Sequence, residues 1–247
     1  MKIGIISDIH SNIDALKKVF EKFKEEDVEK IICIGDVIGI GPYPEKCLDY
    51  LIENEKMFLT FVSGNHERYI LNGLPKRNHN DDNASLMTDE ERNSHYWNHA
   101  RINKKQIEFI KKLKNKDCLK VEDKKIIVEH YPMGINGKFK KFRKIPTEEE
   151  IVELFDDKTA DVYLFGHTHE KYYCEIAQRY YINPGSLGCP KGTNGANAGI
   201  LEIHNKHIKY QQLNVKYDIN KVIKDIEILD YPLCENMIDC FYIKKTN

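Results

Sequence analysis

Seven side chains with nitrogen or oxygen donor atoms follow apolar runs of this sequence, and several stand at the spacing of a metal site. Asp8 and His10 are two residues apart after one apolar run, and His167 and His169 repeat that spacing after another. Alternate residues of an extended chain point to the same side, so each pair presents its donors together. The candidate metal ligands are Asp8, His10, Asp36, Asn65, His130, His167 and His169.

This donor set contains no thiolate, which bears on the metal that it would bind. Nitrogen and oxygen ligands favour Mn, Fe, Zn, Ni or Co over copper(I) or a sulfur cluster. The set is larger than the three or four ligands that a single zinc ion takes. It matches two divalent or trivalent ions about 3.5–4 Å apart that share a bridging carboxylate. The residue types therefore indicate a site for two metal ions.

Each of these residues alone also has an ordinary structural interpretation. Asp8 and Asp36 are residue types that cap helices or close turns, and Asn65 suits a left-handed turn. An isolated histidine such as His130 is more often an ordinary side chain than a ligand, whereas the paired histidines of the last block are harder to explain in that way. The metal interpretation depends on the joint occurrence of all of them after successive strand-like runs.

Residues 1–62 alternate β-branched runs with patterns of helical periodicity. This alternation predicts parallel βαβ units with right-handed crossovers. In an open α/β sheet the carboxyl ends of the strands form the ligand crevice, so the candidate ligands would meet at one rim. Strands are expected at 2–7, 30–34 and 57–62, and helices at 13–24 and 44–54.

The segment 74–114 interrupts this alternation. It begins with a polar stretch rich in Asn and Asp and continues with helices expected at 88–101 and 104–113. We expect a single domain over residues 1–247 that carries 74–114 as a helical insertion beside the rim, where it would help to select the substrate. Trp97 is expected to pack this insertion on the core, with stacking on a base as the alternative.

The remainder of the chain is rich in strand patterns. A hairpin is expected from 118–122 and 125–129, followed by a helix at 147–155 and a strand at 161–165. Runs with antiparallel character follow at 180–183, 198–204 and 207–213, and a late helix is expected at 219–228.

Five sequence blocks occur in the order found in the calcineurin-like metallophosphoesterase superfamily, and the chain resembles that family over about residues 1–215. A single block is weak, since Gly-Asp alone is common, but five blocks in order at strand ends form a specific signal. The blocks are Asp8-x-His10, Gly35-Asp36, Gly64-Asn65-His66-Glu67, His130 and Gly166-His167-x-His169.

Two further stretches resemble small bacterial and archaeal phosphodiesterases of this superfamily, a group that includes diadenosine-polyphosphate hydrolases. They are Gly-Asp-Val-Ile-Gly-Ile-Gly-Pro-Tyr-Pro at 35–44 and Asn-Pro-Gly-Ser-Leu-Gly at 183–188. The chain departs from the group at Ile40, where Tyr is usual, and at Tyr131, where Gly is usual. The first departure bears on a substrate contact.

The resemblance implies an α/β fold, a four-layer α/β/β/α sandwich of two mixed sheets. It also implies two metal ions, with Asp36 bridging them together with a water or hydroxide. The first ion would be held by Asp8, His10 and His169, and the second by Asn65, His130 and His167.

The reaction that the resemblance implies is hydrolysis at phosphorus. The bridging water, acidified by two cations, would attack in line with the leaving oxygen. His66 would donate a proton or a hydrogen bond to that oxygen. Weaker expectations place Arg68, Ser186 and Lys191 at the substrate, with surface solvation or a turn as their alternatives. The basic stretch 138–144 would be either a phosphate-binding loop near the site or a solvated loop.

We therefore expect a metal-dependent phosphodiesterase or phosphatase acting on a small phosphorylated substrate such as a nucleotide, with diadenosine polyphosphates as the named candidate. A protein serine/threonine phosphatase is one alternative, but that branch has Asp and Arg where this chain has Gly39 and Ile40. A catalytically weak interaction scaffold is another, but scaffold relatives tend to lose the histidine at the position of His66, which this chain keeps.

The overall composition argues against some partners. Lys plus Arg number 38 and Asp plus Glu 39, and the resulting formal charge of -1 argues against bulk binding of duplex nucleic acid or of an anionic membrane. No apolar run approaches the roughly 18 residues of a membrane span. The seven cysteines include no Cys-x-x-Cys pair, so we expect reduced thiols in a cytoplasmic protein.

Overall fold

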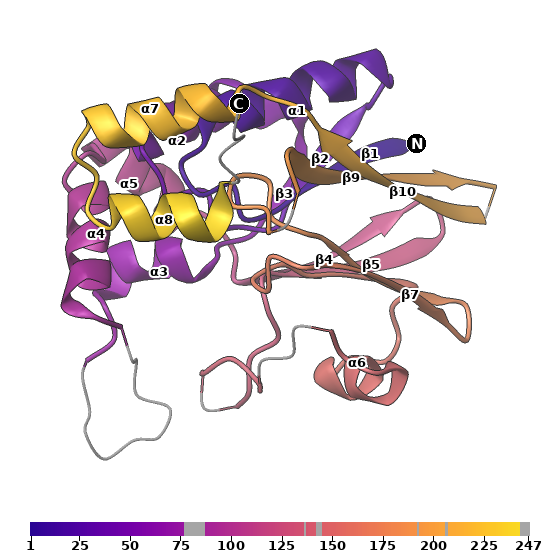
Figure 1. The fold of residues 1–247 in the computed structure, drawn as a ribbon. Coiled ribbons are helices and arrows are strands. Elements are labelled where there is room, and N and C mark those ends of the chain that lie inside the picture. The colour runs from indigo at the N-terminus through magenta and orange to yellow at the C-terminus, as the bar shows by residue number, and fades with distance from the viewer. Residues whose placement is uncertain (77–86, 136, 142–144, 192, 206, 243–247) are drawn as a thin grey trace.

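Two five-stranded sheets lie face to face, and helices cover their outer surfaces (Figure 1). The computed structural model describes residues 1–76, 87–135, 137–141, 145–191, 193–205 and 207–242. From the top of Figure 1 downward, the layers are helices, a first sheet, a second sheet and helix α6 (Glu148–Leu154). This architecture confirms the predicted α/β/β/α sandwich of two mixed sheets.

The first sheet has the strand order β10-β9-β1-β2-β3. In its parallel half, α1 (Ile13–Glu25) and α2 (Pro44–Glu53) connect successive strands on the outer face, and a short 3-10 turn (Glu55–Met57) precedes the third strand. In its antiparallel half, the β9–β10 hairpin pairs with β1 through β9. The strands are β1 (Lys2–Ile6), β2 (Lys30–Cys33), β3 (Phe58–Phe61), β9 (Ala196–His204) and β10 (His207–Val215).

The second sheet has the strand order β4-β5-β6-β8-β7. Its three central strands, β5, β6 and β8, are parallel, and an antiparallel strand flanks them at each edge. The strands are β4 (Lys116–Val121), β5 (Lys124–Glu129), β6 (Val162–Leu164), β7 (Lys171–Ile176) and β8 (Arg179–Pro184).

Alternate residues of the central strands contribute to two different cores. In β1, Ile3 and Ile5 lie in the core between the sheets, whereas Ile6 lies in the core beneath the helices. In β2, Ile32 lies between the sheets and Ile31 faces the helices. Both faces of these strands are buried, and this explains why they read as continuous β-branched runs in the sequence.

Further helices gather where strands β1, β2 and β3 end, at the left of Figure 1. Trp97 packs edge-on against Tyr231, with ring centroids 4.9 Å apart, in an apolar cluster that includes residues of the last two helices. This contact agrees with the predicted packing of Trp97, while the division into one domain with an insertion stays a prediction. The helices are α3 (Asn65–Asn72), α4 (Asp89–His99), α5 (Lys104–Lys111), α7 (Ile219–Ile228) and α8 (Cys234–Phe241).

Among the described residues, two α-helices and one strand lie outside the sequence prediction: α3, α8 and β7. Helix α3 begins on Asn65, a residue type that favours turns, and Glu67 rather than an apolar period stabilises its first turn. Strand β7 is an edge strand that is not fully buried at any position. Helix α8 is short and follows Leu233, whose φ is 68°.

The helices and cysteines give two further observations. Among the helices of the described ranges, none combines the length and the apolar character needed to cross a bilayer. The seven cysteines all lie in the described ranges and form no disulfide, and Cys33, Cys47 and Cys189 are buried.

Candidate active site and metal centre

The predicted metal ligands all lie just beyond the C-terminal ends of strands, at one rim of the sandwich. Both sheets contribute to this rim, as expected for strands whose carboxyl ends meet there. Asp8 and His10 follow β1, Asp36 follows β2, Asn65 opens α3 after β3, His130 follows β5, and His167 and His169 follow β6.

The backbone at five of these ligands is left-handed. The angle φ is 53° at Asp8, 45° at His10, 51° at Asp36, 68° at His167 and 61° at His169. For a residue with a Cβ, such a conformation costs about 1–3 kcal/mol and persists where the surrounding structure enforces it. The concentration of these strained residues at one rim points to a functional site.

A first cluster consists of Asp8, His10 and His169, whose ligand atoms all lie within 4.8 Å of one another. The two Nε2 atoms of His10 and His169 are 2.8 Å apart. Asp8 Oδ1 lies 3.5 Å from His169 Nε2 and 3.8 Å from His10 Nε2. Two imidazole nitrogens at this distance leave at least one lone pair facing the other ring, which a cation between the donors would satisfy.

A second cluster consists of Asp36, His130 and His167, again within 4.8 Å. Asp36 Oδ2 lies 3.0 Å from His130 Nε2. The same carboxylate belongs to a third group with His10 and His66. Asp36 therefore lies between the two predicted sets of ligands, where a bridging carboxylate would have to lie.

Backbone carbonyls orient two of the imidazole rings. His10 Nδ1 lies 3.2 Å from the carbonyl oxygen of Ile38, and His130 Nδ1 lies 2.8 Å from that of Ile34. A carbonyl can only accept, so each Nδ1 carries the proton and donates it. When the ring is neutral, its lone pair is then on Nε2, which faces the clusters, as is usual for metal-ligating histidines.

The protonation states of His10, His167 and Asp36 suit metal binding. Burial lowers the pKa of His10, and burial together with His130 lowers the pKa of His167 to about 3. Both rings are therefore neutral near pH 7 and can donate a lone pair. Burial alone would raise the pKa of Asp36, but the nearby His130, His66 and His10 rings hold it well below its usual value.

Asn65 and His130 are in states that a bound cation would change. Asn65 Oδ1 is buried and has no hydrogen-bond partner among the described residues. Burial would lower the pKa of His130, but Asp36 and Asp8 raise it to about 9. A bound cation would displace that proton and would satisfy the Asn65 oxygen. The residues present therefore fit metal ions held by nitrogen and oxygen.

Glu67 has a role that the sequence did not reveal. Its side chain is fully buried. Its carboxylate accepts hydrogen bonds from the backbone N–H groups of Asp36 and Val37, both at 2.9 Å, and of Gly64 at 2.8 Å. It thereby joins the loop that carries Asp36 to the start of the helix that carries Asn65. Only the bond to Gly64 has a signal in the sequence, because a Glu three residues after a helix cap commonly accepts from the cap backbone.

We predict that Glu67→Gln lowers the free energy of unfolding by about 2 kcal/mol, because a Gln side chain has one acceptor oxygen and would leave buried N–H groups without a partner. The measurement is the urea midpoint of the variant against the parent protein. Glu25→Gln, on the exposed face of α1, is the matched control and should change little. Equal midpoints for both variants would contradict the positioning role.

His66 lies on the first turn of α3 beside both clusters. Its Nε2 is 3.8 Å from Asp36 Oδ2, and its ring meets the His10 ring edge-on with centroids 5.0 Å apart. A Cβ built on Gly39 would lie 1.9 Å from His66 Nδ1. The histidine ring therefore takes this position only because residue 39 has no side chain.

We predict that Gly39→Ala lowers kcat/KM for a phosphodiester by about 100-fold, because a displacement of about 1 Å at a catalytic group can have that effect. The φ of Gly39 is 112°, so backbone strain adds to the clash. Gly73→Ala is the control, because Gly73 has a φ of 79° with no heavy atom within 4 Å of the added Cβ. Equal activity losses in the two variants would show that strain, and not the position of His66, is responsible.

Two of the predicted substrate contacts lie beside the clusters. The Arg68 guanidinium lies 4.5 Å from the centroid of the Phe139 ring, which is 4.6 Å from that of His167. Lys191 is exposed, and after burial and His10 it is among the groups that lower the pKa of His169. The contact of these two cations with substrate stays a prediction.

Ser186, the third predicted substrate contact, is fully buried beneath the first cluster. Its hydroxyl donates to the backbone carbonyl of Asp8 and accepts from the N–H of Cys189, each at 2.8 Å. These bonds fit the alternative in which Ser186 closes a turn and supports Asp8.

The basic stretch 138–144 is only partly described, since residues 142–144 lie outside the described ranges. Lys140 pairs with Asp156 at 2.6 Å and so points to the second sheet's outer helix layer rather than to the clusters. Whether this stretch binds phosphate stays a prediction.

The chain was compared with known families and curated proteins. The model of the calcineurin-like phosphoesterase superfamily domain matches residues 1–206. The uncharacterized protein MJ0912 of Methanocaldococcus jannaschii is 28% identical, in an alignment that covers 91% of this chain and 91% of that protein. Phosphodiesterase MJ0936 of the same organism is 24% identical over 210 residues, which is 85% of this chain and 97% of that protein.

Two solved structures share the fold. A metallophosphoesterase from Sphaerobacter thermophilus superimposes with a TM-score of 0.69 at 21% identity and covers 97% of both chains. The hypothetical protein PH1004 from Pyrococcus horikoshii superimposes with a TM-score of 0.77 at 18% identity, over 98% of this chain and 99% of that one. At these identities the two structures support the architecture.

Proposed function

This chain belongs to the calcineurin-like phosphoesterase superfamily and is a metal-dependent phosphoesterase, and we propose that it is a dinuclear phosphohydrolase. Its substrate would be a small phosphodiester or phosphoanhydride. The observation that carries the proposal is the pair of adjacent ligand clusters, in which the Asp36 carboxylate of the second cluster also lies within 4.8 Å of the ligand nitrogen of His10 in the first. Two clusters with a carboxylate between them suit two ions better than one.

The chain's part in metal binding is to hold the ligands at fixed positions, with Mn, Fe, Zn, Ni and Co as the candidate ions. When bound, the two ions would lower the pKa of a water molecule toward neutral pH. They would also neutralise charge on the phosphate oxygens. Asp8, His10 and His169 would hold one ion, Asn65, His130 and His167 the other, and Asp36 would lie between them.

Other residues of the rim would act on the substrate directly. His66 turns Nε2 toward the clusters, so a proton held on that atom lies where the leaving oxygen would depart. Arg68, beside the second cluster, would supply positive charge to the non-bridging oxygens of the phosphate. These roles need no movement of the main chain, because both side chains already lie at the rim.

Two observations support the proposed substrate class. A formal charge of -1 favours a small anion over a duplex nucleic acid. The similarity to a protein named as a phosphodiesterase supports the diester class, and diadenosine polyphosphates remain the candidate anhydride. We also propose a cytoplasmic setting, because none of the seven cysteines, all of them in the described ranges, forms a disulfide.

The proposed function is tested by removing and restoring metal. The protein is treated with a chelator, dialysed, and assayed with Mn or Co on bis-p-nitrophenyl phosphate and on dinucleoside polyphosphates. We expect turnover that is lost with the chelator and restored by the metal. Faster turnover of a phosphopeptide than of every nucleotide would favour a protein phosphatase, and no turnover of any substrate would favour a scaffold.

A further inference from the structure

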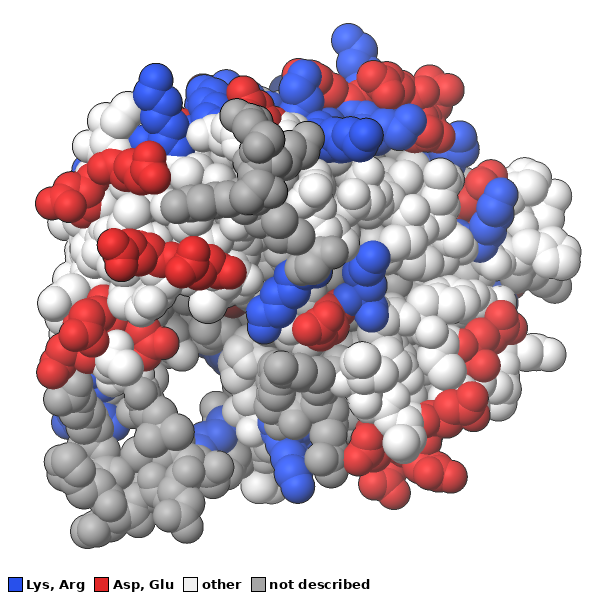
Figure 2. Space-filling model, in the orientation of Figure 1, with Lys and Arg blue, Asp and Glu red and all other residues white. Residues whose placement is uncertain are grey.

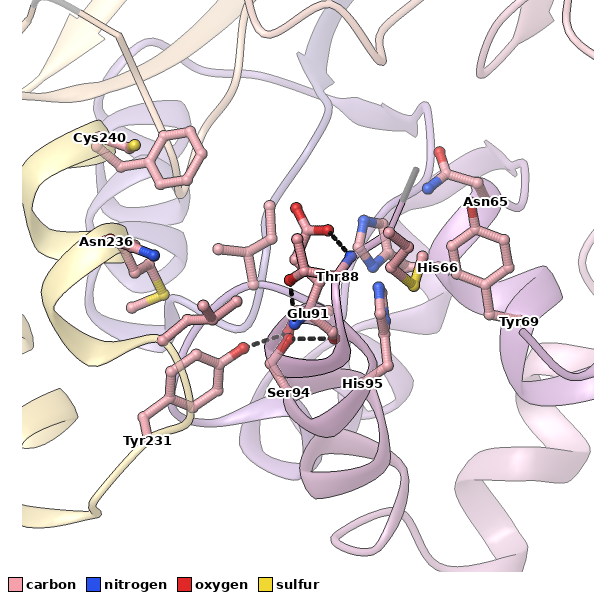
Figure 3. Close-up of a pocket in the computed structure, with 16 residues that line it drawn as sticks. Asn65, His66, Tyr69, Thr88, Glu91, Ser94, His95, Tyr231, Asn236 and Cys240 are labelled. Carbon is pink, nitrogen blue, oxygen red and sulfur yellow. Dashed lines mark hydrogen bonds between the residues drawn. The ribbon is translucent and has the colours of Figure 1, made fainter. Parts of the chain in front are cut away.

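A cavity of about 720 Å³ opens beside the metal centre. It shares Asn65 and His66 with the site, and helices α4 and α8 form its walls (Figure 3). Across the cavity from these two residues lie Asn236 and Cys240 of α8. The volume is in the range of small-molecule sites, about 300–1,000 Å³. Neither metal binding nor the attack on phosphorus uses this space.

The lining of the cavity is mostly apolar and aromatic. None of the described residues that line it is a Lys or an Arg, and Glu91 is the acidic residue among them. Ile40, the residue that replaces the usual Tyr of the related phosphodiesterases, also lines it. The apolar and aromatic residues include Ile40, Tyr69, Tyr231, Leu233, Met237 and Phe241.

The surface around the cavity is acidic. Helix α8 carries Glu235 and Asp239, and helix α4 begins with Asp89, Glu90 and Glu91. Figure 2 shows acidic side chains gathered over this side of the molecule. A second phosphate would meet like charge there, without a cation in the described lining to compensate. The cations of the site, Arg68 and Lys191, are absent from that lining.

One wall of the cavity carries polar nitrogen atoms. The His95 ring is 7% exposed and lies 4.9 Å from the His66 ring, centroid to centroid. His95 Nδ1 has no hydrogen-bond partner among the described residues. A wall that combines an imidazole nitrogen with apolar and aromatic surface suits a planar ring with a polar edge.

The position of His66 determines which part of the substrate would lie in the cavity. In hydrolysis a bond forms between water oxygen and phosphorus, the bond from phosphorus to the leaving oxygen breaks, and that oxygen takes up a proton. His66, the proposed donor of that proton, stands between the clusters and the cavity. The group attached to the leaving oxygen therefore lies on the cavity side.

We propose that this cavity is the leaving-group subsite, and that it takes an uncharged ring system carried on the leaving oxygen, such as an aryl alcohol or a nucleoside, rather than a polyphosphate chain. The inference rests on the proposed function and narrows its substrate class. Products would be the neutral alcohol in the cavity and a phosphomonoester at the metal centre.

The first test measures occupancy of the cavity without catalysis. Cys240 is exposed and lines the cavity, whereas Cys118 is exposed on β4 and does not line it. The metal-loaded protein is alkylated with iodoacetamide in the presence of adenosine, benzyl alcohol or tripolyphosphate, and each thiol is quantified by peptide mass spectrometry. An uncharged ring compound at ten times its Kd should slow alkylation of Cys240 by about tenfold, because only about one chain in eleven is then free.

Under the same conditions Cys118 should react at an unchanged rate, and tripolyphosphate should leave Cys240 unprotected. Failure of both ring compounds to protect Cys240, equal protection of the two thiols, or protection by tripolyphosphate would overturn the inference.

The second test uses activity. Cys240→Trp should fill the cavity and lower kcat/KM for bis-p-nitrophenyl phosphate by about tenfold, the size of effect expected for a lost pocket contact. Asp239→Trp, on the same helix but outside the cavity lining, is the matched control and should retain activity within about twofold. Equal losses in both variants would overturn the subsite. If the parent protein hydrolyses no phosphoester, the proposed function fails, whereas the alkylation result still decides whether the cavity binds rings.

Discussion

Replacing Asp36 by Asn is expected to lower kcat/KM for bis-p-nitrophenyl phosphate by about a thousandfold, the rate equivalent of roughly 4 kcal/mol of transition-state stabilisation. Asn keeps the size of the side chain and one oxygen that can accept the hydrogen bond from the backbone N–H of His66, which is 2.9 Å long in the parent. It removes the negative charge that lies between the two clusters and the oxygen that lies 3.0 Å from His130 Nε2. The loss would therefore arise from a missing bridge rather than from a displaced loop.

The control for this variant is Asp218→Asn, which removes the same charge from a helix cap on α7. Asn caps helices about as well as Asp, so that variant should keep its stability and its activity. Assays of both variants at saturating Mn would give the comparison. An Asp36→Asn protein with parental kcat/KM would contradict the proposed role of the carboxylate.

The second large effect is expected for His66→Gln, which should lower kcat by about 100-fold or more, the usual contribution of a general acid. The metal content should stay the same, because the six clustered side chains and Asn65 remain in place. This second readout matters because His66 also forms a group with His10 and Asp36 within 4.8 Å. A variant that lost metal along with activity would identify His66 as a ligand instead of a proton donor.

His99→Gln on α4 is a suitable control for that experiment. The His99 ring lies 6.2 Å from the His95 ring, centroid to centroid, and does not line the cavity. The His99→Gln substitution therefore removes an imidazole near His95 and leaves the residues of the rim unchanged. Equal losses of kcat in the two histidine variants would contradict the special role of His66.

The sandwich could be predicted from the sequence where its strands are buried on both faces. Ile3 and Ile5 of β1 face the core between the sheets, and Ile6 faces the core beneath the helices. Residues 3–6 of the strand are therefore an uninterrupted apolar run, which the sequence shows clearly. Edge strand β7 gives no such signal, because its side chains are alternately exposed and partly covered. Helix α8 is short, and it is stabilised by packing against α7 and Trp97 rather than by its own periodicity.

The metal ligands could be predicted because the spacing of paired ligands is visible in the sequence. Asp8 and His10 stand two apart, as do His167 and His169, and the structure places their donor atoms together. The left-handed backbone at these residues could not be predicted, because Asp and His adopt it only where tertiary structure enforces it.

The role of Glu67 and the cavity required the folded chain. Glu67 accepts from backbone groups on a loop that lies 31 positions away in sequence, a contact with no local signature. The cavity joins Ile40, α4 and α8, which are far apart along the chain and meet only because the last helix folds back over the rim. Sequence patterns report local periodicity, and neither feature is local.

The most direct test of the dinuclear site is the metal content of the purified protein. After reconstitution with Mn or Co and removal of free ion, the bound metal is measured by inductively coupled plasma mass spectrometry. The ligand clusters predict about two ions per chain in the parent protein, as in other two-metal sites, and fewer in Asp36→Asn. A parent protein that holds less than one ion per chain would contradict the account.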